Sequence, residues 1–298
     1  MKIITEEQIK GLNIPSATCV KWVEEALSLK KDAILPAKIS MKPYDEVFCN
    51  VMPSIVQISD EERAGGVKIV SRYPGRTPTL ESKLILFDAK SGDYKALIDA
   101  NTITTLRTAA VAVHSVKLLA KRDWKTVGFI GMGEIGSATL KILFDTFPDR
   151  EMTVKIFDYK SRGRAFAEKY SQYPSVSFEF YDTISDTVSG SDVILSAPTY
   201  TENDFCSDEC FDEGVLVDPI HTRGFTNCDL FFDKVFGDDY GHICHFKYFE
   251  KFRSFAETAS VIEGTAVGRE NDKERILAYN IGISIHDIFF AKKIFDMV

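Results

Sequence analysis

Three glycines with a characteristic spacing are the residues whose pattern points most directly to chemistry. Gly131, Gly133 and Gly136 follow a short apolar run at 127–130 and open a segment with helical periodicity. In this setting the first glycine permits a tight turn, the second lets backbone approach a pyrophosphate, and the third lets the helix pack close to the strand. The sequence therefore predicts a dinucleotide site at a helix N-terminus, with these candidate contacts: Gly131, Met132, Gly133, Glu134, Ile135 and Gly136.

An acidic residue and a serine extend this predicted site. Asp158 ends the next apolar run, about 20 residues beyond the last glycine, where a carboxylate accepts hydrogen bonds from the adenine-ribose hydroxyls. A carboxylate there favours NAD and repels the additional phosphate of NADP. Lys160, Arg162 and Arg164 follow closely, so NADP is less favoured but not excluded. Ser196, at the end of a later apolar run, is a further candidate contact. The alternative is a glycine-rich turn in a sheet protein that binds no nucleotide.

Two cations, Lys68 and Arg107, have the chemistry to hold a carboxylate and to act on a nitrogen or carbonyl group. The guanidinium of Arg107 is planar and permanently charged, so it can bind a carboxylate through two hydrogen bonds. Lys68 can polarise a reacting group, and its pKa falls if it is removed from water. Taken alone, the residues favour the plainer alternative, in which Lys68, flanked by Val67 and Ile69, points outward from a strand.

The helices and strands that must position these residues follow two different sequence patterns, one before and one after about residue 120. Up to about residue 100 the pattern predicts a helix from Ser16, strands at 67–70, 84–87 and 94–98, and an antiparallel sheet. A long helix is expected at 104–121, with Thr104 or Thr105 as its N-cap.

Beyond Trp124, short apolar runs alternate with segments of helix length, which is typical of βαβ units and a parallel sheet. The runs lie at 127–130, 154–157, 176–180, 193–195 and 215–217. Residues 276–298 are predicted to be helical and are too apolar for a solvated tail, so this segment must pack on the first part or on a partner subunit.

Composition excludes several classes of protein. The chain has 298 residues, 45% of them hydrophobic, which is enough for a large core and argues against global disorder. The net charge of −8 argues against a nucleic-acid partner but leaves room for a local cationic site. The N-terminal segment lacks the apolar core of a signal peptide, and no run is long enough to span a membrane, so a cytoplasmic protein is expected.

The cysteines and histidines give weaker signals. The six cysteines are scattered, which favours reduced thiols. No metal is expected, because the spacings of the cysteines and histidines between 206 and 245 do not match a zinc site. His221 and Asp218 follow a predicted strand, at the edge where ligands bind in open α/β sheets, and each is a candidate acid or base. A loop histidine that makes only a local hydrogen bond is at least as good an interpretation of His221.

Together these motifs resemble the ornithine cyclodeaminase/μ-crystallin family, which includes NAD(P)-dependent alanine dehydrogenases and ketimine reductases. The resemblance covers most of the chain and is carried by 67–70, 84–88, 103–110, the glycine turn and 282–287. It implies a Rossmann domain inserted into a discontinuous α+β domain for substrate binding and dimerisation. The expected bounds are 1–118 plus 276–298 for the substrate domain and 119–275 for the NAD-binding domain. The resemblance also implies a homodimer.

The resemblance assigns roles to individual positions. Lys68 matches the active-site lysine of the family, and Arg107 matches the arginine that binds the substrate carboxylate. Lys38 falls where many members have a second substrate-binding arginine, and Thr79 falls where members have a small hydroxyl residue near the substrate. Thr108 would contact the cofactor phosphates.

Two departures from the family pattern bear on the reaction. Cyclodeaminases carry an aspartate after the fifth Rossmann strand, but here the segment 218–229 is shorter and no aspartate aligns, which argues against cyclisation of ornithine. The segment is similar to that of the siderophore-precursor branch, whose members oxidise N-(1-amino-1-carboxy-2-ethyl)-glutamate with NAD. The second departure is Ile135 and Gly136, where many members have glutamine and alanine.

The expected activity is hydride transfer between the nicotinamide of NAD and the α-carbon of an amino or imino acid, through an imine, with an amino-acid-like substrate. Oxidative hydrolysis of an N-substituted amino acid is one form of it. Two alternatives stay open: an ornithine cyclodeaminase that releases ammonia without net redox change, and a non-catalytic protein similar to μ-crystallin that holds a nucleotide and a small ligand.

Overall fold

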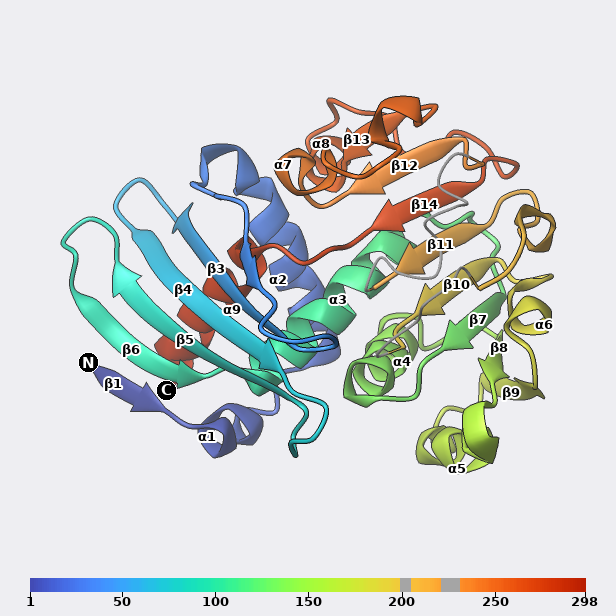
Figure 1. Cartoon of the computed structure of the whole chain (residues 1–298), viewed down its shortest axis with the longest axis horizontal. Helices are drawn as coiled ribbons and strands as arrows, with labels where there is room; N and C mark the ends of the chain where they lie inside the picture. Colours follow the sequence, from blue (N-terminus) through green and yellow to red (C-terminus); the bar gives the residue numbers. More distant parts are fainter. Residues whose placement is uncertain (199–204, 221–230) are drawn as a thin grey trace. The chain divides into compact units, whose positions relative to one another are not determined.

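A computed structural model describes residues 1–198, 205–220 and 231–298 of the chain. The chain forms two compact units (Figure 1). Unit 1 contains Met1–Arg107 and Gly282–Val298, and unit 2 contains Thr108–Ile281. Unit 2 is thus inserted in sequence between the two segments of unit 1. The assignment of substrate binding to one and NAD binding to the other stays a prediction.

Unit 1 is built on a six-stranded, mostly antiparallel sheet. Its strand order is β1-β6-β5-β4-β3-β2, and only β1 and β6 pair in parallel. The strands are β1 (Lys2–Ile4), β2 (Ile39–Met41), β3 (Phe48–Gln57), β4 (Arg63–Arg72), β5 (Leu80–Asp88) and β6 (Tyr94–Asp99). The helices are α1 (Glu6–Gly11), α2 (Ser16–Ser28) and α9 (Ser284–Met297), with the first residues of α3 (Asn101–Leu119).

One face of this sheet is covered by α9, which contacts β3, β4 and β5 (Figure 1). Along β4 the side chains alternate, so Gly66, Lys68 and Val70 face the helix while Ile69 faces away. The Gly66 backbone lies so close to Ile288 that a Cβ there would be 2.4 Å from the isoleucine side chain. The Trp22 ring of α2 meets the Phe290 ring of α9 edge to face, with centroids 5.1 Å apart. Burial of these apolar side chains holds α9 on the sheet.

Unit 2 contains an eight-stranded sheet in which every strand pair is parallel. The order is β13-β12-β14-β11-β10-β7-β8-β9. The strands are β7 (Thr126–Ile130), β8 (Met152–Phe157), β9 (Val176–Tyr181), β10 (Val193–Ser196), β11 (Leu216–Pro219), β12 (Lys234–Gly237), β13 (Phe255–Glu257) and β14 (Ile276–Tyr279).

Helices cover this sheet, as the alternation of strand and helix predicts. They are α4 (Glu134–Thr146), α5 (Gly163–Ala167), α6 (Ile184–Val188), α7 (Tyr240–Ile243), α8 (Thr258–Ile262) and the larger part of α3. The strands β10, β11 and β14 are buried along their whole length, and apart from Asp218 on β11 and Ser196 on β10 their residues are apolar. The expected fold class, a parallel α/β unit inserted in sequence into an α+β unit, is confirmed.

Two expectations about individual elements were wrong. The helix α3 begins at Asn101, so Thr104 and Thr105 lie inside it and neither is its N-cap. The Thr104 hydroxyl instead lies 2.9 Å from that of Ser82 on β5. The predicted helix at 276–298 is a strand followed by a helix: Ile276–Tyr279 forms the buried β14, and Gly282 adopts a positive φ of 81° before α9 begins. A fully buried apolar run has no periodicity that distinguishes a strand from a helix.

Among the residues that the structure describes, no helix is both long enough and apolar enough to cross a membrane.

Candidate active site

The glycine turn has the geometry that a pyrophosphate site requires. Gly131 directly follows β7 with φ 103°, and a Cβ there would lie 2.5 Å from the carbonyl oxygen of Ala197. A Cβ on Gly136 would lie 2.1 Å from the carbonyl oxygen of Gly131, so α4 packs directly on the turn. A Cβ on Gly133, the N-cap of α4, would meet no atom of the described residues within 4 Å. Within the described part of the chain no side chain caps this helix, so its first N–H groups are available to an anion.

The turn lies at the point where the strand order reverses. β7 is flanked by β8 on one side and by β10 on the other, and ligands of open α/β sheets bind at such a point, outside the carboxyl ends of the strands. Asp158 directly follows β8, and its Oδ1 accepts a 2.6 Å hydrogen bond from the backbone N–H of Gly163. This bond fixes the carboxylate at the carboxyl end of β8, and its role toward an adenine ribose stays a prediction.

The basic residues after Asp158 are partly engaged by aromatic rings. Lys160 Nζ lies 5.0 Å from the ring centre of Tyr159, and the Arg164 guanidinium lies 5.1 Å from that of Phe180. Arg162 is exposed. These contacts restrain two of the three cations that could attract an additional phosphate.

Thr108 and Ser196 occupy different environments. Thr108 lies half-buried on α3, one residue after Arg107. Ser196 is fully buried at the end of β10, in register with Ile130 and Pro219, and its carbonyl accepts a hydrogen bond from Ile220 N–H. Their roles as cofactor contacts stay predictions.

A buried ionic cluster in unit 1 joins the two predicted catalytic residues. Lys68 on β4 and Arg107 on α3 both donate to a single carboxylate oxygen, Oδ1 of Asp287 on α9. The Lys68 Nζ distance is 2.6 Å and the Arg107 Nε distance is 2.9 Å. The side chains of Lys68 and Asp287 are fully buried, and that of Arg107 is 8% exposed. Lys68 is therefore not the outward-pointing surface lysine that its apolar neighbours suggested.

The electrostatics of this cluster place Lys68 near its titration point at neutral pH. Burial and the nearby charge of Arg107 lower the pKa of Lys68 to about 7, against the opposing effect of Asp287. Burial acts to raise the pKa of Asp287, but the charges of Arg107 and Lys68 outweigh burial and keep this pKa below its usual value. The cluster thus combines an ionised carboxylate, a permanent cation and an amine that can gain or lose a proton.

Lys38 and Thr79 stand in different relations to the cluster. Lys38 is half-buried, and its charge contributes to lowering the pKa of Lys68, so it lies close enough to act on the same site. Thr79 directly precedes β5, and its carbonyl accepts a hydrogen bond from Tyr73 N–H. The β4–β5 ladder pairs Lys68 with Leu84, so Thr79 lies five residues away along the strand, on the order of 16 Å. Its role near the substrate stays a prediction.

Unit 2 holds a second buried polar cluster at the carboxyl edge of its sheet. Asn280 follows β14 and donates through Nδ2 to Oδ2 of Asp218 on β11, at 2.6 Å, and to Oγ of Ser115 on α3, at 2.9 Å. Asp238, directly after β12, is also buried. The parallel register places Asp218, Asn280 and Asp238 on the same face of the sheet.

Asp218 is held in its neutral form at neutral pH. Burial raises its pKa to about 8, and the nearby Asp238 carboxylate adds to the effect while the Asn280 hydrogen bond opposes it. A carboxylic acid that keeps its proton near pH 7 can donate a hydrogen bond or a proton. The other candidate in this segment, His221, lies outside the residues that the structure describes.

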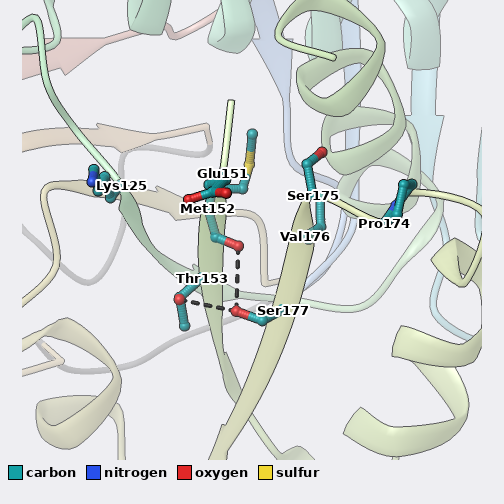
Figure 2. A pocket seen from close by; sticks show the side chains of 8 residues that line it. All are labelled: Lys125, Glu151, Met152, Thr153, Pro174, Ser175, Val176 and Ser177. Carbon is teal, nitrogen blue, oxygen red and sulfur yellow. Dashed lines mark hydrogen bonds between the residues drawn. The ribbon is translucent and has the colours of Figure 1, made fainter. Parts of the chain in front are cut away.

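A surface pocket of about 370 Å³ in unit 2 lies at the opposite edge of the sheet (Figure 2). It is formed where β8 and β9 begin, and in it the hydroxyl of Thr153 lies 3.0 Å from that of Ser177. Lys125, just before β7, also lines it. Because ligands of such sheets bind at the carboxyl ends of the strands, this pocket is not the candidate site.

Residues 1–198, 205–220 and 231–298 contain no group of three or more histidine, cysteine, aspartate or glutamate side chains placed to hold a metal. Of the cysteines considered for a metal site, Cys228 lies outside these ranges.

Four residues of these clusters are not among the site residues predicted from the sequence: Asp287, Asn280, Ser115 and Asp238. Asp287 was noted only as part of the 282–287 motif, and Asn280 was placed in a predicted helix. Asp287 carried a signal that could have been used, because it is an acidic residue in a helix whose neighbours are apolar. Asn280 carried none.

Comparisons with known proteins agree with this architecture. The family model described as "Ornithine cyclodeaminase/mu-crystallin family" matches residues 2–298. The N-((2S)-2-amino-2-carboxyethyl)-L-glutamate dehydrogenase of Staphylococcus aureus is 29% identical over 266 residues, covering 82% of this chain and 77% of that protein.

Two solved structures have the same fold. The Δ¹-pyrroline-2-carboxylate reductase of Thermococcus litoralis, in complex with NADH and L-proline, matches with a TM-score of 0.83 and 21% identity over 99% of this chain and 97% of that chain. An archaeal alanine dehydrogenase dimer with bound NAD matches with a TM-score of 0.84 and 24% identity over 99% and 95%.

Proposed function

Because the chain belongs to the ornithine cyclodeaminase/μ-crystallin family, we propose that it is an NAD-dependent oxidoreductase acting on an amino or imino acid. The observation that carries the proposal is the buried cluster in which Lys68 and Arg107 share one oxygen of Asp287. A relative that covers most of the chain is named a dehydrogenase of an N-substituted amino acid, and related folds were solved with NAD or NADH. This supports an N-substituted amino acid as the substrate.

The residues of unit 2 fit the cofactor. The glycine turn and the uncapped N-terminus of α4 would hold the pyrophosphate, and Asp158 would accept hydrogen bonds from the adenine ribose. The carboxylate of Asp158 favours NAD over NADP. When bound, the nicotinamide exchanges a hydride with the substrate α-carbon.

The residues of unit 1 would bind the substrate and move a proton. Arg107 would bind the substrate carboxylate, and the half-buried Lys38 would add a second positive charge. Lys68, with a pKa of about 7, would take the proton from the substrate amine as it becomes an imine, and return it in the reverse direction. The neutral carboxyl of Asp218 is the candidate for a second acid.

We propose a homodimer formed through the sheet face of unit 1 that α9 does not cover. Ile3, Ile39, Ile69 and Ile85 are exposed on this face, and the strand register places them on the same side. The ion pair of Lys83 and Asp99 lies on the same face, beside Ile69. Several exposed apolar side chains on one face of a sheet are typical of an interface. A cytoplasmic location and the absence of a nucleic-acid partner stay predictions.

A paired assay tests the proposed activity. The purified protein is incubated with NAD⁺ and a panel of amino acids that includes ornithine, alanine and N-(1-amino-1-carboxy-2-ethyl)-glutamate, while NADH absorbance and ammonia are both followed. Net NADH formation with one substrate is the expected result. Ammonia from ornithine without NADH would make the protein a cyclodeaminase. Tight NADH binding without turnover of any amine would favour the non-catalytic alternative.

A further inference from the structure

One carboxylate in unit 1 is shared by two cations that come from distant parts of the chain. Oδ1 of Asp287 accepts from Lys68 on β4 and from Arg107 on α3, which are 219 and 180 residues away in sequence. Its other oxygen, Oδ2, is buried and has no hydrogen-bond partner among the residues that the structure describes. Both cations therefore share a single acceptor atom.

The backbone around Asp287 is fixed on both sides. Three residues earlier, Ser284 Oγ donates a 2.6 Å hydrogen bond to the carbonyl of Pro53 on β3. One residue later, Ile288 packs on Gly66 of β4. The backbone of Gly282 packs on the guanidinium of Arg107, and a Cβ at Gly282 would lie only 2.9 Å from Nη1. The start of α9 thus holds Asp287 at a set position against β4 and the guanidinium.

The charges that face this carboxylate come from every element packed around it. Lys68 and Arg107 lie within hydrogen-bond distance, His286 precedes Asp287 on α9, and Lys38 acts on Lys68 from the segment before β2. In a buried site, like charges repel strongly unless a counter-charge lies between them. Asp287 is the carboxylate that offsets the repulsion between Lys68 and Arg107.

We propose that Asp287 is a positioning residue for the reaction: it holds Lys68 and Arg107 together and sets the pH at which Lys68 exchanges its proton. The proposal rests on the proposed function, in which Lys68 handles the substrate proton. Its action is exerted through Lys68, since Asp287 itself stays ionised between two cations.

The direction of the effect follows from the charges. Asp287 raises the pKa of Lys68, whereas burial, Arg107 and Lys38 lower it. Removing the negative charge leaves the lowering effects unopposed, so the pKa of Lys68 falls below about 7. The limb of the pH–rate profile that reports Lys68 moves to lower pH, whether the amine acts as a base in oxidation or as an acid in reduction.

Three variants separate this role from a merely structural one. Asp287→Asn keeps the shape and removes the charge, and Asp287→Glu keeps the charge. Asp296→Asn removes the ion pair with Lys292 near the exposed end of the same helix and serves as the matched control. In the pH profile of kcat/KM, we expect Asp287→Asn to move the limb that reports Lys68 by about one pH unit or more toward lower pH. The maximum of the profile should fall at least tenfold. Asp287→Glu should restore part of the shift, and Asp296→Asn should leave the profile in place.

A loss of activity that is equal at every pH, with the limb unmoved, would overturn the proposal and leave Asp287 a structural residue. If Asp287→Asn does not fold, the double variant Lys68→Met/Asp287→Asn provides the test. Removing one of the two repelling cations should restore folding and give a higher urea midpoint than Asp287→Asn alone. A double variant no more stable than the single one would also overturn the proposal.

A measurement without substrate keeps this inference distinct from the proposed function. NMR titration of protein labelled at lysine Cε, with Lys68→Met identifying the signal, gives the pKa of Lys68 directly. A signal that titrates near pH 7, and at lower pH in Asp287→Asn, would support the inference even if no amino acid is turned over. An unchanged titration in Asp287→Asn would overturn it, even in an active enzyme.

Discussion

The side-chain amide of Asn280 donates a 2.6 Å hydrogen bond to Oδ2 of the fully buried Asp218. The hydrogen bond favours the ionised carboxyl, yet burial outweighs it and the pKa of Asp218 lies at about 8. The folded protein therefore keeps a proton that an unfolded chain, with a carboxyl pKa near 3.8, has already lost at neutral pH.

This difference predicts that Asp218→Asn stabilises the protein at neutral and alkaline pH. The stability contributed by the retained proton is fully present below the unfolded pKa of 3.8 and is lost as pH rises to about 8. Asparagine mimics the protonated carboxyl and has no proton to lose. The free energy of unfolding of the variant, relative to the native protein, should grow between these pH values and exceed about 1 kcal/mol at pH 8. Urea unfolding at a series of pH values measures it, with the exposed Asp272→Asn as control. If the difference in free energy of unfolding between Asp218→Asn and the native protein does not change with pH, Asp218 does not retain its proton in the folded state.

Lys68→Ala should damage turnover and spare the cofactor. Removing a general acid or base costs roughly 100-fold or more in kcat. The substitution leaves the glycine turn and Asp158 intact, so the dissociation constant for NADH should change by less than about twofold, within ordinary mutational scatter. Steady-state kinetics and NADH fluorescence measure the two effects. Lys21→Ala, which removes an exposed lysine from α2 of the same unit, is the control. Turnover close to that of the native protein would show that Lys68 is not the active-site lysine.

Two glycines of the turn should respond differently to alanine. In Gly131→Ala, the alanine must adopt a positive φ of 103°, and its methyl group clashes with the Ala197 carbonyl. The variant should therefore have a free energy of unfolding lower by roughly 1–3 kcal/mol. For Gly133→Ala, no atom of the described residues lies within 4 Å of the new methyl group, so the variant should keep its melting temperature and bind NADH about tenfold or more weakly. Thermal unfolding and fluorescence titration measure the two. Gly11→Ala, in open space and far along the chain from the turn, is the control. Undiminished NADH affinity in Gly133→Ala would argue against a pyrophosphate at this turn.

Asp158→Ser should reduce the preference for NAD over NADP. The carboxylate is held at the end of β8 by the N–H of Gly163, and its charge repels a 2′-phosphate. Removing it should change the ratio of kcat/KM for the two cofactors at least tenfold in favour of NADP, because the exposed Arg162 remains nearby. Kinetics with both cofactors measure the ratio. A ratio that stays the same would place the ribose elsewhere.

Ile69→Lys should weaken self-association. Ile69 is exposed near the middle of the uncovered sheet face, and a charge there must be desolvated when two such faces meet. Sedimentation should show a shift from dimer to monomer, while Tyr159→Lys, at an exposed site in unit 2, should leave the mass unchanged. A native protein that sediments as a monomer would refute the proposed dimer.

The sequence predicted the parts of the fold that carry a periodic or short-range signal. The alternation beyond Trp124 predicted the parallel sheet, and the glycine spacing predicted a turn whose geometry the structure bears out. It failed where burial is complete on all sides, since Ile276–Tyr279 forms a strand inside a stretch expected to be helical. That strand lies between β11 and β12, a long-range pairing that no local pattern reveals.

The candidate site was predictable only in part for a similar reason. Lys68 and Arg107 were identified through a family resemblance, since their local patterns suggested surface charges. What makes them a cluster is Asp287, whose partnership depends on contacts across 219 and 180 residues of sequence. The position of Thr79 relative to Lys68 likewise depends on the register of β4 and β5, which the sequence does not specify.

Asp287 lies 219 residues after Lys68 in the sequence, so the ribosome makes it long after Lys68. Residues 108–281 leave the ribosome before α9 and can fold as a contiguous unit, whereas the sheet of unit 1 must wait with one face uncovered until residues 282–298 follow. During that interval Lys68 on β4 and Arg107 on α3 have not yet met their counter-ion, and burying the two cations together without it is costly. Arrival of α9 supplies Asp287, whose single negative charge offsets part of this positive charge, and covers the open face of the sheet.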